Sequence, residues 1–133
     1  MKIQKHSTVQ NIFDQFNSRF PHLKLQFYKK DHQNNEGSKS EDMVSHQTHL
    51  SQISPDLTEK EFYIDSEQSV SDFEQMMKNE FNLNIQVFRK SNDLWLQTTS
   101  TDHWSLKKQN GKGQRSTLEY NIDPIDITDF DVS

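Results

Sequence analysis

Hydrophobic residues near the start of the chain recur every three or four positions, the spacing of one face of an α-helix. Thr8 stands directly before this stripe, where a hydroxyl oxygen can accept a hydrogen bond from a free N–H group of the first turn. Pro21 follows it and disfavours helical geometry at the residue before. The pattern predicts a helix over residues 8–20, with a stripe of Val9, Ile12, Phe13, Phe16 and Phe20.

The segment after Pro21 alternates between apolar and polar residues, which is typical of a strand with one buried face. We therefore predict a strand over residues 23–30. Its two sides carry Leu23, Leu25 and Phe27 on the one hand and Lys24, Gln26 and Tyr28 on the other.

The same order of helix and strand returns in the second half of the chain. Ser69 is an N-cap candidate with Asp72 three residues later, and a strand-like segment, 84–90, follows the stripe. The pattern favours an internal repeat of a helix–strand unit. The alternative is that two unrelated amphipathic helix–strand pairs resemble each other. The second stripe consists of Val70, Phe73, Met77 and Phe81.

Two further β-prone segments complete the predicted fold. Residues 61–64 form a short strand, and residues 94–99 pair with 84–90 through a polar loop at 91–93. We predict an α+β fold with αββ-αββ-α order, in which a four-stranded mixed sheet carries two amphipathic helices on one face. The expected strand order is 61–64, 23–30, 84–90, 94–99, and a permuted ferredoxin-like order is the alternative.

The ends of the domain follow from where periodicity is lost. Residues 1–113 are expected to form a single α+β domain with a polar loop insertion at 31–60. A short C-terminal helix, capped by Thr101 or Asp102, is expected to end at Gly111. Residues 114–133 are expected to form an acidic, flexible tail.

Composition narrows the class of protein. The 133 residues carry a net charge of −5, and 30% of them are hydrophobic. An acidic chain argues against a general nucleic-acid binder, and the lack of cysteine excludes disulfides and thiolate metal sites. The N-terminus has no apolar run, and no stretch approaches the roughly 18 apolar residues that span a membrane. A cytoplasmic protein without membrane contact is therefore expected.

No catalytic, metal or cofactor site emerges from the motifs. Asp102 and His103 are adjacent, so at a helix start their side chains point in different directions and do not form a triad. His46 and His49 have helical spacing but lack further ligands, and are expected to be solvent-exposed. The segment GKGQRS lacks the P-loop spacing. The sequence predicts neither catalytic residues nor a cofactor, and it argues against an enzyme.

The face of the sheet opposite the helices is the candidate functional surface. Aromatic and glutamine side chains would share it, rimmed by Lys24, Lys30, Arg89 and Lys90, and an open patch of this kind marks an interaction site. The leading hypothesis is a non-enzymatic module that binds a protein partner or a second copy. Single-stranded RNA is the alternative ligand, and a C-terminal segment that covers the face is the alternative structure. The predicted binding residues are Gln26, Tyr28, Tyr63, Gln86, Phe88, Trp95 and Gln97.

The block FRKSNDLWLQTTSTDHWSLKKQNGKG resembles a block in a set of small bacterial α+β proteins that share the pattern WLxTTxTDxWxL. The likeness extends over Ser69–Gly113 and is looser over Thr8–Lys30. No activity is established for that set. The resemblance implies a shared small α+β fold and implies nothing about chemistry.

Overall fold

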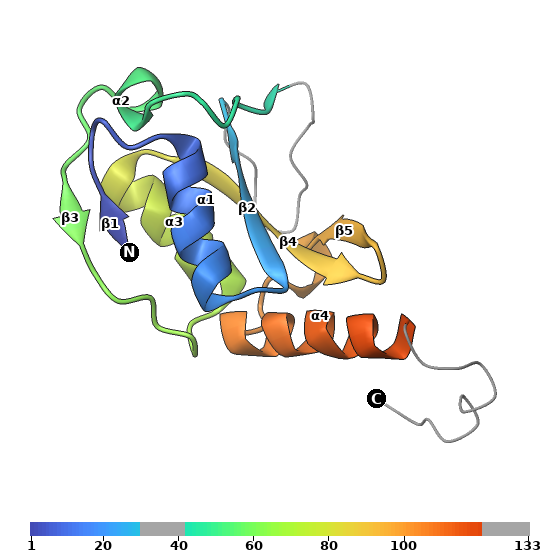
Figure 1. Cartoon of the computed structure of the whole chain (residues 1–133). Helices are drawn as coiled ribbons and strands as arrows, with labels where there is room; N and C mark the ends of the chain where they lie inside the picture. The colour runs from blue at the N-terminus through green and yellow to red at the C-terminus, as the bar shows by residue number, and fades with distance from the viewer. Residues whose placement is uncertain (30–41, 121–133) are drawn as a thin grey trace.

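The computed structural model describes residues 1–29 and 42–120, and it is an α+β fold (Figure 1). Within these residues, no helix is long and apolar enough to cross a membrane. The elements in chain order are β1 (Lys2–Ile3), α1 (Val9–Arg19), β2 (Leu23–Tyr28), α2 (Leu50–Ile53), β3 (Lys60–Glu61), α3 (Val70–Phe81), β4 (Asn84–Ser91), β5 (Leu94–Gln97), the 3₁₀ turn η2 (Thr99–Thr101) and α4 (Leu106–Tyr120).

The main sheet has three antiparallel strands in the order β2-β4-β5. This order agrees with the predicted neighbours 23–30, 84–90 and 94–99. The fourth strand and the mixed character of the sheet were wrong. Of the segment 61–64, only Glu61 is in a strand, β3, which pairs with β1 in a separate two-stranded sheet. Two-residue strands are too short for an alternating pattern to reveal their partner.

The helices α1 and α3 pack on β2 and β4, respectively, and form the core with them (Figure 1). The rings of Phe16 in α1 and Phe73 in α3 stack with centroids 5.4 Å apart, and both side chains are fully buried. The predicted apolar sides of the strands lie in this core, since Leu23, Leu25, Phe27, Ile85 and Val87 are all buried.

Both predicted N-caps on these helices are confirmed. The Thr8 hydroxyl accepts a hydrogen bond from the Asn11 N–H, and the Ser69 hydroxyl accepts one from the Asp72 N–H. Each side chain satisfies a donor of the first turn that has no partner within the helix.

The N-termini of the helices α1 to α4 meet in two pairs that are built alike. The residues before α1 and α2 form an isolated antiparallel bridge, as do the residues before α3 and α4. Across each bridge, the first N–H of each helix donates to a carbonyl of the opposite segment, so this donor does not need water. The bonds run from Val9 to Thr48, from Leu50 to Ser7, from Val70 to Trp104 and from Leu106 to Gln68, at 2.8–3.0 Å.

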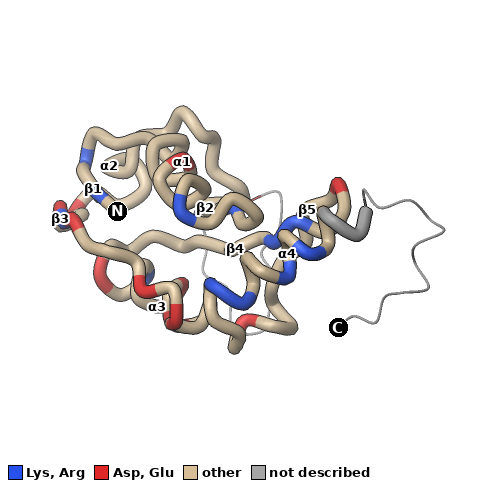
Figure 2. Tube along the Cα trace, turned by 60° about the horizontal axis from the view of Figure 1, so that its bottom comes forward, with Lys and Arg blue, Asp and Glu red and all other residues tan. Residues whose placement is uncertain are grey.

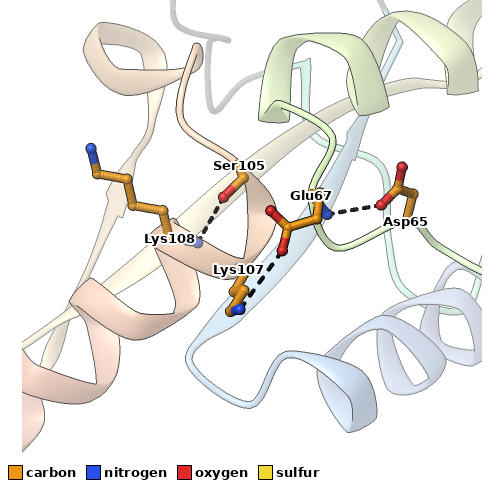
Figure 3. A network of polar contacts seen from close by, with 5 residues as sticks. All are labelled: Asp65, Glu67, Ser105, Lys107 and Lys108. Carbon is orange, nitrogen blue, oxygen red and sulfur yellow. Dashed lines mark hydrogen bonds and ion pairs between the residues drawn. The ribbon is translucent and has the colours of Figure 1, made fainter.

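The last helix, α4, differs most from its prediction. It begins at Leu106, where the Ser105 hydroxyl accepts from the Lys108 N–H, and not at a cap on Thr101 or Asp102 (Figure 3). It also continues through Gly111 to Tyr120, so the boundary expected at residue 113 falls inside α4. Tertiary packing overrides the weak helix propensity of the glycines here.

Gly113 is required because α4 approaches the main sheet closely. A Cβ at this position would lie 2.9 Å from His22 Cβ and 3.0 Å from His22 O. The His22 N–H also donates to Asn110 Oδ1, and its carbonyl accepts from the Lys90 N–H. His22 therefore links α4 to both β2 and β4.

The two glycines of α4 are expected to respond oppositely to alanine. Gly113→Ala should lower the free energy of unfolding by about 1–3 kcal/mol, because the new methyl group meets backbone. Gly111→Ala should raise it by up to ~1 kcal/mol, because alanine favours helix and the nearest atom is Arg115 Nη1, at 3.3 Å on a flexible side chain. Urea denaturation of both variants measures this. Equal shifts would contradict the close approach at His22.

Candidate functional site

Four side chains gather on the face of the main sheet that points away from the buried core. Lys24 pairs with Phe88 across β2 and β4, and Lys90 pairs with Trp95 across β4 and β5, so all four share this face. The Lys24 Nζ lies 5.0 Å from the Trp95 ring centroid and 5.4 Å from that of Phe88. The Lys90 Nζ lies 5.1 Å from the Trp95 centroid. We call Lys24, Phe88, Lys90 and Trp95 the Trp95 cluster.

The Trp95 cluster concentrates positive charge. Burial lowers the pKa of Lys24, and the nearby charge of Lys90 lowers it further. Within residues 1–29 and 42–120, neither lysine forms an ion pair. The ring faces stabilise the two ammonium groups by cation–π attraction, but they do not neutralise them.

Three of the predicted binding residues lie on the same face but are buried. Tyr28 and Gln86 are each 1% exposed, and Gln26 is 8% exposed. Burial raises the pKa of Tyr28 to about 12, so its phenol stays neutral at physiological pH. These side chains are not available as the open surface that the sequence predicted, whereas Phe88 and Trp95 are only partly buried.

The buried residues have polar roles of their own. The Gln26 Oε1 lies 3.2 Å from His46 Nε2, and the other ring nitrogen of His46 lies 3.0 Å from Gln10 Oε1. The Gln86 side chain donates to the Val87 carbonyl, and its Oε1 has no hydrogen-bond partner within the part of the chain that the structure describes. His46 is therefore half-buried and packed against Phe13, contrary to its predicted exposure, while His49 is exposed as predicted.

Tyr63 does not belong to this face. It is 96% exposed and follows β3, outside the three-stranded sheet. Its predicted position requires residues 61–64 to be a neighbour of β2, whereas β3 pairs with β1. Gln97 does lie on the predicted face, opposite Phe88, and is exposed. Lys30 lies outside the described residues.

A second tryptophan lies between two cations on the other side of β4. The Arg89 guanidinium lies 5.7 Å from the Trp104 ring centroid, and the Lys108 Nζ lies 4.4 Å from it. Arg89 also donates to Gln109 in α4, and burial lowers its pKa. Arg89 was predicted to lie at the rim of the opposite face, and its contact with Trp104 was not predicted. The signal was the adjacent pair Arg89 and Lys90, whose side chains must leave a strand on opposite faces.

The neighbouring Asp102 and His103 do not form a catalytic pair in this arrangement. Asp102 is buried, and its carbonyl accepts a hydrogen bond from the Ser71 N–H at the start of α3. His103 is exposed. The described residues also contain no group of three or more His, Cys, Asp or Glu side chains that would hold a metal ion.

A depression of about 550 Å³ lies beside the first turns of α4. The Lys107 Nζ lies 3.7 Å from Glu67 Oε1, and the Glu67 N–H donates to Asp65 Oδ1 (Figure 3). Both partners of this ion pair are well exposed, so water screens it and it contributes little to stability. The lining residues are Glu67, Ser105, Lys107, Lys108, Asn110, Gly111, Gln114 and Arg115.

Charge is divided between the two ends of the molecule (Figure 2). Residues 84–117 contain six lysines and arginines and only two acidic residues, whereas residues 42–81 contain nine acidic residues and two lysines. The net charge of −5 therefore conceals a basic stretch of the chain, to which Phe88, Lys90 and Trp95 of the Trp95 cluster belong.

No family model, curated protein or solved structure matches this chain.

Proposed function

We propose that this protein is a non-enzymatic binding module whose Trp95 cluster receives an acidic segment of a protein partner. The observation that carries the proposal is that two lysine ammonium groups lie about 5 Å from one tryptophan ring without a carboxylate beside either among the described residues. A tryptophan at the centre of a surface patch with a polar rim is typical of binding hot spots. A carboxylate from a partner would relieve the repulsion between the two lysines.

The same charges disfavour a symmetric dimer through this face. A two-fold axis through the Trp95 cluster would bring Lys24 and Lys90 of one copy against the same residues of the other. Like charges placed together at an interface cost several kcal/mol. A distinct acidic partner therefore fits better than a second copy bound by the same face. The sequence-based hypothesis named a protein partner or a second copy and gave no charge for the partner.

Single-stranded RNA fits the face less well than an acidic protein segment does. Base stacking needs exposed aromatic rings, but Tyr28 is buried and Tyr63 lies elsewhere. The ring of Trp95 already has two lysine side chains over it. Only Phe88 and Trp95 remain of the four aromatic residues on which that hypothesis relied.

Neutralising either lysine should weaken binding of an acidic probe. We expect Lys24→Gln and Lys90→Gln each to raise the Kd of a twelve-residue Asp-rich peptide with one central phenylalanine by about three- to tenfold. Added salt should weaken binding by the wild-type chain more than binding by the variants. Fluorescence anisotropy of the labelled peptide measures both effects.

Lys60→Gln is the matched control, since it makes the same charge change at the far end of the molecule. Lys60 pairs with Glu80 at 2.9 Å, and its replacement should leave the Kd unchanged. An equal loss in all three variants would mean that only net charge matters. Tighter binding of a twelve-nucleotide oligouridine than of the peptide would instead support the RNA hypothesis.

We also propose that the two halves of the chain are an internal repeat of an αββα unit. The paired helix N-termini support this, since in both pairs the first two N–H groups of each helix donate to carbonyls of the opposite segment. A matching hydrogen bond on each of the two strands β2 and β4 also supports the repeat. The Val44 N–H donates to Phe27 O in β2, and the Thr98 N–H donates to Val87 O in β4. Gln26 and Gln86, which match in the sequence repeat, face each other at the centre of the β2–β4 pair. On this proposal, the Trp95 cluster lies mainly in the second unit.

A further inference from the structure

One aromatic side chain projects into solvent at the end of the molecule opposite the Trp95 cluster. Tyr63 is 96% exposed and lies two residues after β3, and β3 and β5 lie at opposite ends of the fold (Figure 1, Figure 2). Tyrosine combines a large apolar ring with a polar hydroxyl, and it is enriched at protein interfaces. The ring of Tyr63 is therefore available to a partner.

Two carboxylates flank this ring on the same side of the chain. Exposure alternates along residues 61–65, as it does in a strand with one buried side. Ile64 is buried, and Phe62 is partly buried against the core. The side chains of Glu61, Tyr63 and Asp65 are all exposed. The outward side of this segment therefore has the order acid, aromatic, acid.

The rest of the protein holds this segment in place. The Phe62 N–H donates to Met1 O at 2.9 Å, and β3 pairs with β1 directly before it. The Phe62 ring also stacks on Phe81 with centroids 5.9 Å apart. A surface that is already ordered loses less conformational entropy when it binds. The outward side chains are therefore presented from a fixed backbone.

The order acid, aromatic, acid is complementary to the Trp95 cluster, in which two ammonium groups lie on either side of a shared ring site. The Lys24 Nζ and the Lys90 Nζ lie 5.0 Å and 5.1 Å from the Trp95 centroid. The carboxylates beside Tyr63 match them in number and are opposite in sign. Residues 59–67 carry four acidic residues and one lysine, so two copies with a net charge of −5 each can still meet through oppositely charged surfaces.

A contact between these surfaces joins opposite ends of two copies. It does not place the lysines of one copy against those of the other, which is the cost that disfavours a symmetric dimer. A contact between different surfaces is heterologous, and it leaves one free site and one free segment on the resulting pair. Further copies can therefore add to the pair.

We propose that the acidic partner of the Trp95 cluster is a second copy of this chain, bound head to tail. Residues 61–65 of one copy enter the cluster of the next, with Tyr63 against the two aromatic rings and the flanking carboxylates beside the two ammonium groups. This inference rests on the proposed function, since it names the partner of the same site. One short segment buries less surface than a standard interface, so the association is weak and depends on concentration.

Sedimentation velocity of the full chain over a range of concentrations measures the association. The wild-type chain should form species larger than a dimer at the highest concentrations. Tyr63→Ala and Trp95→Ala should each raise the dissociation constant by about tenfold or more, the loss typical of an interface anchor. Glu61→Gln should raise it by about three- to tenfold. Asp56→Asn makes the same charge change at an exposed position outside the segment and should leave it unchanged.

A mixture of two variants tests the head-to-tail arrangement. Tyr63→Ala keeps an intact site, and Trp95→Ala keeps an intact segment, so one productive contact remains between them. Each variant alone should stay monomeric where the wild-type chain associates, and an equimolar mixture should form a dimer and nothing larger. Lys90→Gln in place of Trp95→Ala leaves the ring in the sheet, and its mixture with Tyr63→Ala should form more dimer than either variant does alone.

Three results would overturn the inference. One is a wild-type chain that stays monomeric at every concentration while the Asp-rich peptide binds it, which leaves the proposed function standing with a different partner. Another is association that Tyr63→Ala does not weaken. The third is a mixture of Tyr63→Ala and Trp95→Ala that forms no dimer. Failure of the peptide to bind the dilute wild-type chain would remove the proposed function and this inference together.

Discussion

Replacing Phe73 with alanine is expected to lower the free energy of unfolding by about 3–5 kcal/mol, the cost of a large cavity in a packed core. The side chain is fully buried, and its ring stacks on Phe16 with centroids 5.4 Å apart. This contact joins α1 to α3, and so connects the two helix–strand units. Denaturation in urea, followed by circular dichroism, measures the change.

Two comparisons make the Phe73 result specific. Tyr63→Ala removes an aromatic ring that is 96% exposed, and it should change stability by no more than ~0.5 kcal/mol. The double variant of Phe16 and Phe73 should show a coupling of about 0.5–1.5 kcal/mol, since aromatic pairs add this beyond area burial. Strictly additive losses would mean that the stacked pair contributes nothing of its own.

Most of the central fold was predictable because its signals are local. The stripes that end at Phe20 and Phe81 repeat at helical spacing, and Thr8 and Ser69 cap them as expected. The strands β2 and β4 alternate clearly. In contrast, β1 and β3 have two residues each, and only the folded chain brings them together. No window of sequence that short specifies a partner.

The end of α4 was mispredicted for a different reason. Gly111 and Gly113 are residues that normally end a helix, yet both lie inside α4. This part of α4 is in contact with His22, through Asn110 and Gly113, and His22 is far away in the sequence. Propensity is a weak preference that such tertiary contacts override.

The candidate site was predicted in outline and changed in detail. Alternation assigned Phe88, Trp95 and both lysines to one face correctly, because side chains on a strand have a period of two. It did not reveal that Tyr28 and Gln86 are buried there, since alternation assigns a face and does not say what covers it. Because the ammonium groups of both lysines lie close to the Trp95 ring, an acidic ligand is favoured over one that stacks on the ring.

Trp95→Ala is expected to weaken binding of the Asp-rich peptide by about thirtyfold or more, the loss typical of a hot-spot tryptophan. The ring positions both ammonium groups of the Trp95 cluster, so its removal leaves two flexible, mutually repelling lysines. Stability should fall by only ~1 kcal/mol, because Trp95 is partly exposed on an edge strand. Titration of the labelled peptide and urea denaturation separate the two effects.

Trp104→Ala is the sharpest control for Trp95, because Trp104 also lies between two cations, Arg89 and Lys108. Its ring lies on the opposite side of β4, so the peptide should bind the Trp104 variant almost as tightly as it binds the wild-type chain. A cycle combining Trp95→Ala with Lys24→Gln should also show a coupling of about 0.5–2 kcal/mol in binding. If the two tryptophan variants lose affinity equally, the peptide recognises the basic end as a whole and not the Trp95 cluster.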